Sequence, residues 1–191
     1  KSYGLNREID VVPTGIDLKQ FLNYNPGEME NNSLKREVSI KTNIPVVLYI
    51  GRLAKEKSID LVIKQMQLLI EEIPEAKLLL VGDGPERGNL EKLTDKLGLN
   101  DSVVFAGEKP WNQIQRYYEL GDVFVSASTT ETQGLTYLEA MASGLPVMAR
   151  YDSNLEGVID DGENGYFFEK NNNLSYILAN LLENEIKLKR M

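Results

Sequence analysis

Two short segments of the sequence hold the side chains best suited to binding a charged ligand. The first is Gly51-Arg52-Leu53-Ala54-Lys55-Glu56-Lys57, and the second runs from Ser126 to Ala149 and contains Glu131, Gly134-Leu135 and Glu139. Cationic side chains and the N–H groups at the start of a helix bind phosphate, whereas carboxylates accept hydrogen bonds from hydroxyl groups. Together these groups suit a ligand in which a sugar, a diphosphate and a ribose are joined in series.

Arg52 and Lys57 follow an apolar run, Val46–Ile50, that predicts a buried strand, and they precede a run with helical spacing. In open α/β sheets the ligand crevice lies at the carboxyl ends of the strands, where helix N-termini offer N–H groups to phosphate. Both cations are therefore in the right place to hold a diphosphate. The alternative is that they are solvated loop charges without a ligand.

Another glycine-rich segment, Gly82-Asp83-Gly84-Pro85-Glu86-Arg87-Gly88, superficially resembles a dinucleotide-binding fingerprint. Its third glycine comes one residue late, and the fingerprint belongs after the first strand of such a sheet. We therefore interpret Gly82 and Gly84 as a turn that lets a nucleotide approach the backbone. The alternative is a tight turn with Pro85 at the first helical position, which needs no ligand.

Glu131 and Glu139 bracket Gly134-Leu135, where a helix is expected to begin. Phosphate can bind the N–H groups of that helix start, while the two carboxylates accept hydroxyl hydrogens from two sugars. Two alternatives stay open at this point. Glu131 would be an ordinary exposed loop acid, and Thr136-x-x-Glu139 would be a capping box in which Glu139 only satisfies the first N–H groups of the helix.

Short apolar runs alternate with longer amphipathic runs, which predicts βα units and an α/β fold with a parallel sheet. The predicted strands are Val46–Ile50, Lys77–Val81, Val103–Ala106, Val123–Ser126, Pro146–Ala149 and Gly165–Phe168. The clearest helix spans Ile59 to Ile73, with Ser58 as its N-cap and Pro74 as its stop. Further helices are predicted at Pro85–Leu97, Asn112–Leu120, Gly134–Ser143 and from Leu174 toward Leu188, with a loop around a short helix at Tyr24–Thr42.

The composition limits the classes of function. A chain of 191 residues can close one hydrophobic core, so we expect a single domain over residues 1–191. The net charge of −8 argues against a nucleic-acid partner held by a broad cationic face, so any anionic ligand must be bound locally. The chain has no histidine, which excludes a Ser–His triad, a histidine base and histidine-ligated zinc within it.

Other features bear on cellular context. The absence of cysteine suits a cytoplasmic protein, and no apolar run approaches the roughly 20 residues of a membrane-spanning helix. The sequence begins at Lys1 without a methionine or a signal-type apolar stretch. It therefore looks like an excised segment whose N-terminal neighbour is missing.

A series of motifs resembles the C-terminal domain of the family-four retaining glycosyltransferases, also called glycosyltransferase group one. They are VVPTGID at Val11–Asp17, YIGRLAKEKSID at Tyr49–Asp60, LLLVGDGPER at Leu78–Arg87, VVFAGEKP at Val103–Pro110, the two-glutamate stretch at Ser126–Ala149 and EGVIDDGENGYFF at Glu156–Phe168. These motifs cover nearly the whole chain in order. The resemblance implies one half of a two-domain GT-B enzyme, a Rossmann-like parallel sheet with helices on both faces that binds the donor. The N-terminal acceptor domain would then be absent.

The resemblance implies catalytic roles for Arg52, Lys57 and Glu131. Arg52 and Lys57 match the positions that grip the donor diphosphate and stabilise the charge that builds on it. Glu131 matches the position that binds hydroxyls of the transferred sugar, and Glu139 the position that binds the ribose hydroxyls. The other implied donor-binding residues are Gly51, Gly82, Gly84, Lys109, Gly134 and Leu135, with Glu108 and Lys109 near the nucleobase. Ser58 departs from the family pattern, which often has glycine, and a serine cap would make that change harmless.

The resemblance also implies that a UDP-sugar is bound without a metal ion or other cofactor. The segment TETQGLTYLEAM is similar in sequence to bacterial enzymes that glucosylate diacylglycerol. This similarity implies UDP-glucose as donor and a membrane lipid as acceptor. The full-length protein would be cytoplasmic and peripheral at the inner face of the membrane, and this chain alone would be inactive. A protein or polysaccharide acceptor stays open, as do a UDP-sugar 2-epimerase-like enzyme and a non-catalytic nucleotide-binding module.

Overall fold

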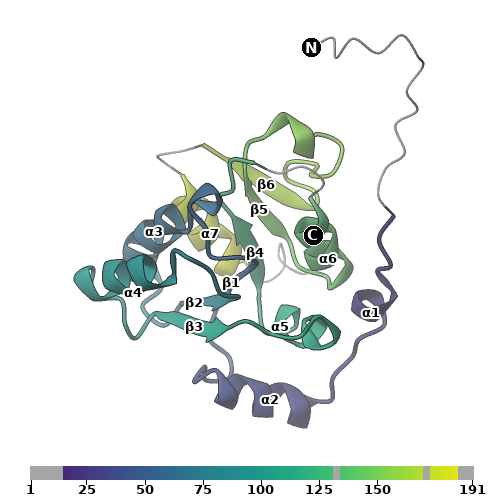
Figure 1. Cartoon of the computed structure of the whole chain (residues 1–191), viewed down its shortest axis with the longest axis horizontal. Helices are drawn as coiled ribbons and strands as arrows, with labels where there is room; N and C mark the ends of the chain where they lie inside the picture. The colour runs from purple at the N-terminus through teal and green to yellow at the C-terminus, as the bar shows by residue number, and fades with distance from the viewer. Residues whose placement is uncertain (1–14, 131–133, 170–172, 185–191) are drawn as a thin grey trace.

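A parallel sheet of six strands, in the order β3-β2-β1-β4-β5-β6, forms the centre of the chain (Figure 1). The computed structural model describes residues 15–130, 134–169 and 173–184. The strands are β1 (Val46–Ile50), β2 (Lys77–Val81), β3 (Val103–Gly107), β4 (Val123–Ser126), β5 (Val147–Arg150) and β6 (Gly165–Phe168). The α/β fold predicted from the alternation of apolar and amphipathic runs is confirmed.

The strand boundaries follow the apolar runs, because a parallel sheet covered by helices buries its strands on both faces. β1, β2, β4 and β6 have the predicted bounds. β5 begins and ends one residue later than predicted, at Val147 and Arg150, and Pro146 is excluded because it has no N–H to donate to the sheet. β3 extends one residue further, to Gly107, whose carbonyl oxygen accepts a hydrogen bond of 2.9 Å from the Gly82 N–H.

Helices cover both faces of the sheet, and the side chains of β1 alternate between the two layers. Val47 and Tyr49 pack with α3, α4 and α7, whereas Val46, Leu48 and Ile50 pack with α1, α2, α5 and α6. The first layer comprises α3 (Ile59–Glu72), α4 (Arg87–Lys96) and α7 (Leu174–Leu182); the second comprises α1 (Lys19–Leu22), α2 (Glu28–Glu37), α5 (Gln115–Tyr118) and α6 (Leu135–Ala142). Short 3-10 turns are η1 (Lys55–Lys57), η2 (Trp111–Gln113) and η3 (Ser153–Leu155). Across the described parts of the chain, no helix is long and apolar enough to cross a membrane.

The direction in which successive strands are added to the sheet reverses between β1 and β4. From β1 the chain passes through α3 to β2 and then to β3 on one side, and it returns to place β4 on the other side of β1. Open α/β sheets bind their ligands at such a switch point, outside the carboxyl ends of the strands. The loops that follow β1 and β4 are therefore the place where this fold positions a site.

Three helix predictions need correction. The helix expected from Leu174 toward Leu188 ends at Leu182, because Glu183 is already its C-cap and Asn184 is not helical. The helix expected at Pro85–Leu97 begins only at Arg87, because the Arg87 N–H donates to the Gly84 carbonyl in a turn that includes Pro85. Pro85 is therefore not the first helical residue. The helix expected at Asn112–Leu120 is divided into η2 and α5, with Ile114 between them. Pro110 is the N-cap of η2 and has the extended backbone that is usual at that position, with φ −59° and ψ 139°.

Ser58 does not cap α3 in the way the sequence predicts. It occupies the N-cap position, but its backbone is left-handed, with φ 48° and ψ 39°, and its side chain makes no capping hydrogen bond. A serine cap requires an extended backbone so that the hydroxyl can reach the N–H groups of the first turn. Ser58 is therefore a conformational cost in this structure, and the expectation that a serine cap makes it harmless is wrong.

Candidate functional site

The loops after β1 and β4 are joined by hydrogen bonds at the switch point. The Lys57 ammonium lies 3.3 Å from the Ser128 hydroxyl, just beyond the end of β4. The Glu56 carbonyl oxygen accepts from both the N–H and the hydroxyl of Thr129, at 3.1 and 3.3 Å. The fold thus brings the two segments singled out in the sequence to one place, although β1 and β4 are far apart along the chain.

Arg52 stands at the surface of this crevice. Its side chain is 66% exposed, and its guanidinium group makes an ion pair of 2.7 Å with the Glu56 carboxylate. That hydrogen bond holds the pKa of Glu56 below its ordinary value. Exposed ion pairs contribute little to stability, so a diphosphate can compete with Glu56 for the guanidinium. The loop backbone is fixed independently, because the Tyr49 hydroxyl donates to the Arg52 carbonyl oxygen at 3.0 Å.

Five of the predicted donor-binding residues line one hollow of about 460 Å³ at the carboxyl ends of β1, β2 and β3. They are Gly51, Arg52, Gly82, Gly84 and Lys109, and the remaining lining residues are Ile50, Val81, Asp83, Glu108 and Ile114. The Lys109 ammonium lies 5.1 Å from the centre of the Tyr117 ring, within cation–π range. Glu108 and Lys109, which the resemblance assigned to the nucleobase region, therefore share a hollow with Arg52.

The requirement for glycine at positions 82 and 84 has a structural cause that the sequence did not reveal. Gly82 has φ 139°, and a Cβ atom there would collide with the Gly51 carbonyl oxygen. A Cβ atom at Gly84 would collide with the carbonyl of Leu53, whose N–H donates to the Asp83 carbonyl at 2.9 Å. Both positions need glycine because the loops after β1 and β2 pack backbone to backbone. Close approach of a nucleotide is not required to explain them, and their part in donor binding stays a prediction.

The start of α6 differs from the capping box that the sequence allowed. Gly134 is the N-cap, with φ 62° and ψ 26°, and the helix begins at Leu135. Thr136 already lies inside the first turn, so it cannot be the capping residue, and the capping-box interpretation is wrong. The first N–H groups of a helix have no partner within the helix, which leaves the start of α6 suited to an anion.

Glu139 makes its contact with α5 instead. Its carboxylate Oε2 accepts a hydrogen bond of 2.7 Å from the Tyr118 hydroxyl, and the residue is 6% exposed. Burial raises the pKa of Glu139 above its ordinary value, and the hydrogen bond from Tyr118 opposes that rise. Burial and the neighbouring Glu139 raise the pKa of Tyr118 well above its ordinary value, so the phenol remains a donor.

Only part of the predicted set therefore lines the hollow. Gly51, Arg52, Gly82, Gly84 and Lys109 line the hollow, whereas Lys57 reaches the end of β4. Gly134, Leu135 and Glu139 lie on α6 and at its start, in the element that follows β4. Glu131 lies outside the described residues, so its role stays a prediction.

Sequence reasoning missed the partners of these residues. Ser128 and Thr129 lie within the stretch that was singled out, but they were given no role. Tyr118 was not singled out, because nothing in its spacing relates it to Glu139, which lies 21 residues later. Only the packing of α5 beside α6 brings the two side chains together.

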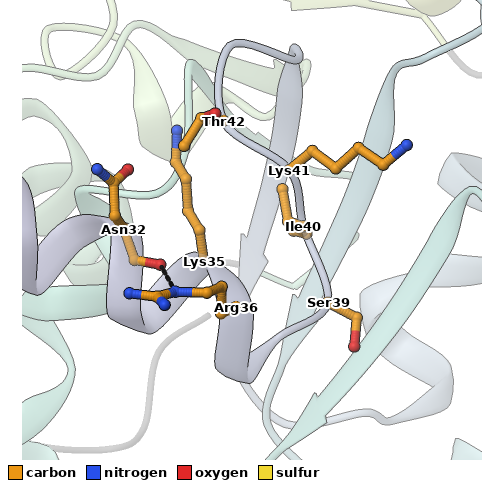
Figure 2. A pocket seen from close by; sticks show the side chains of 7 residues that line it. All are labelled: Asn32, Lys35, Arg36, Ser39, Ile40, Lys41 and Thr42. Carbon is orange, nitrogen blue, oxygen red and sulfur yellow. Dashed lines mark hydrogen bonds between the residues drawn. The ribbon is translucent and has the colours of Figure 1, made fainter.

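A second hollow, of about 450 Å³, lies between the end of α2 and the start of β1 and is lined by Asn32, Lys35, Arg36, Ser39, Ile40, Lys41 and Thr42. Its volume is almost that of the first hollow, so size does not identify the site. Figure 2 shows that its cations diverge: Arg36 turns to the Asn32 carbonyl, 3.1 Å away, and Lys41 extends away from Lys35. This hollow lies toward the amino end of β1, so the geometry favours the hollow at the carboxyl ends.

Within residues 15–130, 134–169 and 173–184, no group of three or more acidic side chains could hold a metal ion. Arg52, Lys57, Lys109 and the start of α6 are the features near the crevice that suit an anion. The binding of a UDP-sugar without metal stays a prediction.

The strand order and the crevice at the switch point define a Rossmann-like α/β domain. The chain belongs to the glycosyl transferases group 1 family, whose profile matches residues 30–191. This confirms the family indicated by the motifs.

Two curated relatives carry the same name, alpha-monoglucosyldiacylglycerol synthase. The protein from Acholeplasma laidlawii is 36% identical over 177 residues, which cover 93% of this chain and 44% of the relative. The protein from Streptococcus pneumoniae is 36% identical over 159 residues, which cover 83% of this chain and 36% of the relative. The chain thus spans less than half the length of these two relatives.

Among solved structures, HepE from Anabaena in complex with UDP and glucose matches 92% of this chain and 48% of its own, with a TM-score of 0.80 and 23% identity. At that identity the likeness concerns the fold alone. It agrees with the prediction of one Rossmann-like half of a GT-B glycosyltransferase, which is confirmed.

Proposed function

We propose that this chain is the donor-binding half of a retaining glycosyltransferase that transfers glucose from UDP-glucose to a membrane diacylglycerol. The observation that carries the proposal is the junction of the β1 and β4 loops, where Lys57 meets Ser128 beside the exposed guanidinium of Arg52. Two relatives named for glucosylation of diacylglycerol share 36% identity with the chain and support the choice of substrates.

In this proposal, Arg52 and Lys57 bind the donor diphosphate together with the N–H groups at Gly134 and Leu135. Their positive charge interacts more strongly as negative charge builds on the leaving UDP, so they favour the transition state over the bound donor. This charge takes the place of a metal ion. Glu131 would accept hydroxyls of the glucose, and Glu139 those of the ribose.

The junction explains why both cations would act on one ligand. Lys57 ends η1 and Arg52 follows β1, yet both belong to a loop that Thr129 ties to the end of β4 through the Glu56 carbonyl. A fixed loop places positive charge without ordering it during the reaction, which is the condition for electrostatic stabilisation of a transition state. Arg52 needs only to exchange the Glu56 carboxylate for phosphate oxygens.

The partner of this half would be the N-terminal domain that the longer relatives contain. We infer that acceptor binding requires that domain, and that the complete enzyme acts in the cytoplasm at the inner membrane surface. The isolated chain should therefore produce no glucolipid from UDP-glucose and diacylglycerol vesicles. A robust rate of transfer by the purified chain would contradict the division of labour between two halves.

Donor binding can be tested directly by isothermal titration calorimetry of the chain with UDP in EDTA. We expect binding in EDTA that magnesium does not strengthen. Lys57→Ala should weaken binding about 10- to 100-fold, since hydrogen bonds to charged groups are worth about 1.5–3 kcal/mol. Lys92→Ala, which removes an exposed lysine of α4, is the matched control and should bind as the unmodified chain does. Binding that appears only with magnesium would contradict the proposal.

A further inference from the structure

We propose that Tyr118 is a positioning residue for Glu139: it engages one carboxylate oxygen so that the other is directed to the ribose of a bound nucleotide. This inference rests on the proposed function, because it concerns the same donor site. It adds a residue from α5, an element to which no motif in the sequence assigns a role.

The Tyr118 hydroxyl is held in place by its surroundings. The side chain is fully buried, and its ring packs edge-on against Phe21 at 5.5 Å and beside Phe124 at 6.0 Å between ring centres. These contacts come from α1 and β4, so the phenol is fixed by two elements besides its own. Movement of the hydroxyl oxygen away from α6 would require the ring to shift and the core of this layer to repack.

The hydroxyl contacts α6 at two points. It donates to Glu139 Oε2 at 2.7 Å, and the Thr136 carbonyl oxygen lies 3.4 Å away as a weaker second acceptor. A carboxylate has two oxygens that can each accept hydrogen bonds. Because Oε2 is held by Tyr118 inside the protein, Oε1 is the oxygen that remains for the hydroxyls of a ligand.

The same hydrogen bond also matters for the charge of Glu139. Burial disfavours the ionised carboxylate, whereas a hydrogen bond donated by Tyr118 favours it. An ionised carboxylate accepts hydrogen bonds at both oxygens, but a protonated one donates from one of them. Tyr118 therefore holds one carboxylate oxygen of Glu139 and also favours the accepting, ionised form of the carboxylate.

A purely structural tie between α5 and α6 would behave differently. Loss of such a tie lowers stability, but it does not change how the folded protein distinguishes one nucleotide from another. The diagnostic quantity is therefore the ratio of the dissociation constants for 2′,3′-dideoxy-UDP and UDP. This ratio reports only on the ribose hydroxyls.

The experiment measures that ratio by calorimetry for the unmodified chain and for Tyr118→Phe. Phenylalanine keeps the ring packing and removes only the hydroxyl. We expect UDP to bind about 3- to 10-fold more weakly, the range for one hydrogen bond, with dideoxy-UDP changed by less than about 2-fold. Tyr24→Phe is the matched control, because it also removes a hydrogen bond from a tyrosine to a glutamate. Tyr24, which precedes α2, donates to Glu30 within α2 at 2.9 Å. It should leave both constants unchanged.

Glu139→Gln gives a second test, which on its own leaves Tyr118 in place. Tyr118 should hold the amide oxygen of Gln at position 139 and turn its NH₂ group toward the ribose. The charged acceptor is then lost, so the ratio should fall. Adding Tyr118→Phe to Glu139→Gln frees the amide to turn, so UDP should then bind more tightly than to Glu139→Gln alone. Tyr118→Phe should thus weaken UDP binding in the unmodified chain but strengthen it in Glu139→Gln.

The outcomes separate this inference from the proposed function. If the unmodified chain fails to bind UDP, both are overturned. If the chain prefers UDP and Glu139→Ala removes the preference, the proposed role of Glu139 stands. Tyr118→Phe with an unchanged ratio, or Glu139→Gln with its preference intact, would then overturn the role of Tyr118 alone.

Discussion

Ser58→Gly should stabilise the folded chain, although it removes a hydroxyl from the start of a helix. The backbone of Ser58 is left-handed, with φ 48° and ψ 39°, and its side chain makes no capping hydrogen bond. A left-handed conformation costs an L-residue about 1–2 kcal/mol. Glycine avoids that cost but loses about 0.5–1 kcal/mol through the greater freedom of the unfolded chain. The free energy of unfolding should therefore rise by about 0.5–1 kcal/mol.

Thermal melts and urea titrations measure this gain, which corresponds to a rise of about 1–4 °C in Tm for a chain of this size. Ser175→Gly in α7 is the matched control, because it makes the same chemical change inside a helix. It should destabilise the chain by about 0.5 kcal/mol. If Ser58→Gly is destabilised as much as Ser175→Gly, the assignment of strain to Ser58 is refuted.

Three further changes test other parts of the account. Gly82→Ala should lower the free energy of unfolding by at least about 3 kcal/mol in urea titrations, because its Cβ collides with the Gly51 carbonyl and its backbone has φ 139°. Glu139→Gln should become more stable relative to the unmodified chain as pH rises above 4.5, measured by urea unfolding across pH. Burial raises the native pKa of Glu139 above 4.5, so ionisation costs stability only in the unmodified chain. Arg52→Ala should leave stability almost unchanged but weaken UDP about 10-fold or more in calorimetry, because its exposed ion pair matters little to folding.

Much of the fold could be predicted because the strands are continuous apolar runs. β1 and β2 are almost fully buried, and their carboxyl ends coincide with the change from apolar residues to Gly51 and Gly82. The helix ends were predicted less well, since they depend on local backbone conformation. Ser58 and Thr136 both matched a capping pattern, but the structure places left-handed residues at the two N-caps.

The residues of the candidate site could be predicted from the sequence, but the contacts that join them could not. Arg52 and Lys57 follow one strand, and the segment leading to α6 follows another, so the carboxyl-end rule for parallel sheets was enough to place both. The hydrogen bond between Tyr118 and Glu139 depends on the packing of two helices, which no spacing in the sequence encodes. The requirement for glycine at position 82 could not be predicted either, because the backbone that a Cβ atom there would meet belongs to the loop after β1.

The most direct test of the central claim is a titration of the ¹⁵N-labelled chain with UDP in EDTA, followed through the backbone amide resonances. We expect the largest shifts at Gly51-Arg52, at Lys57 and in the first turn of α6, with the resonances of Lys35–Thr42 unchanged. The two hollows are almost equal in volume and lie toward opposite ends of β1, so the experiment distinguishes them clearly. Shifts confined to Lys35–Thr42, with none at Arg52, Lys57 or α6, would contradict the account.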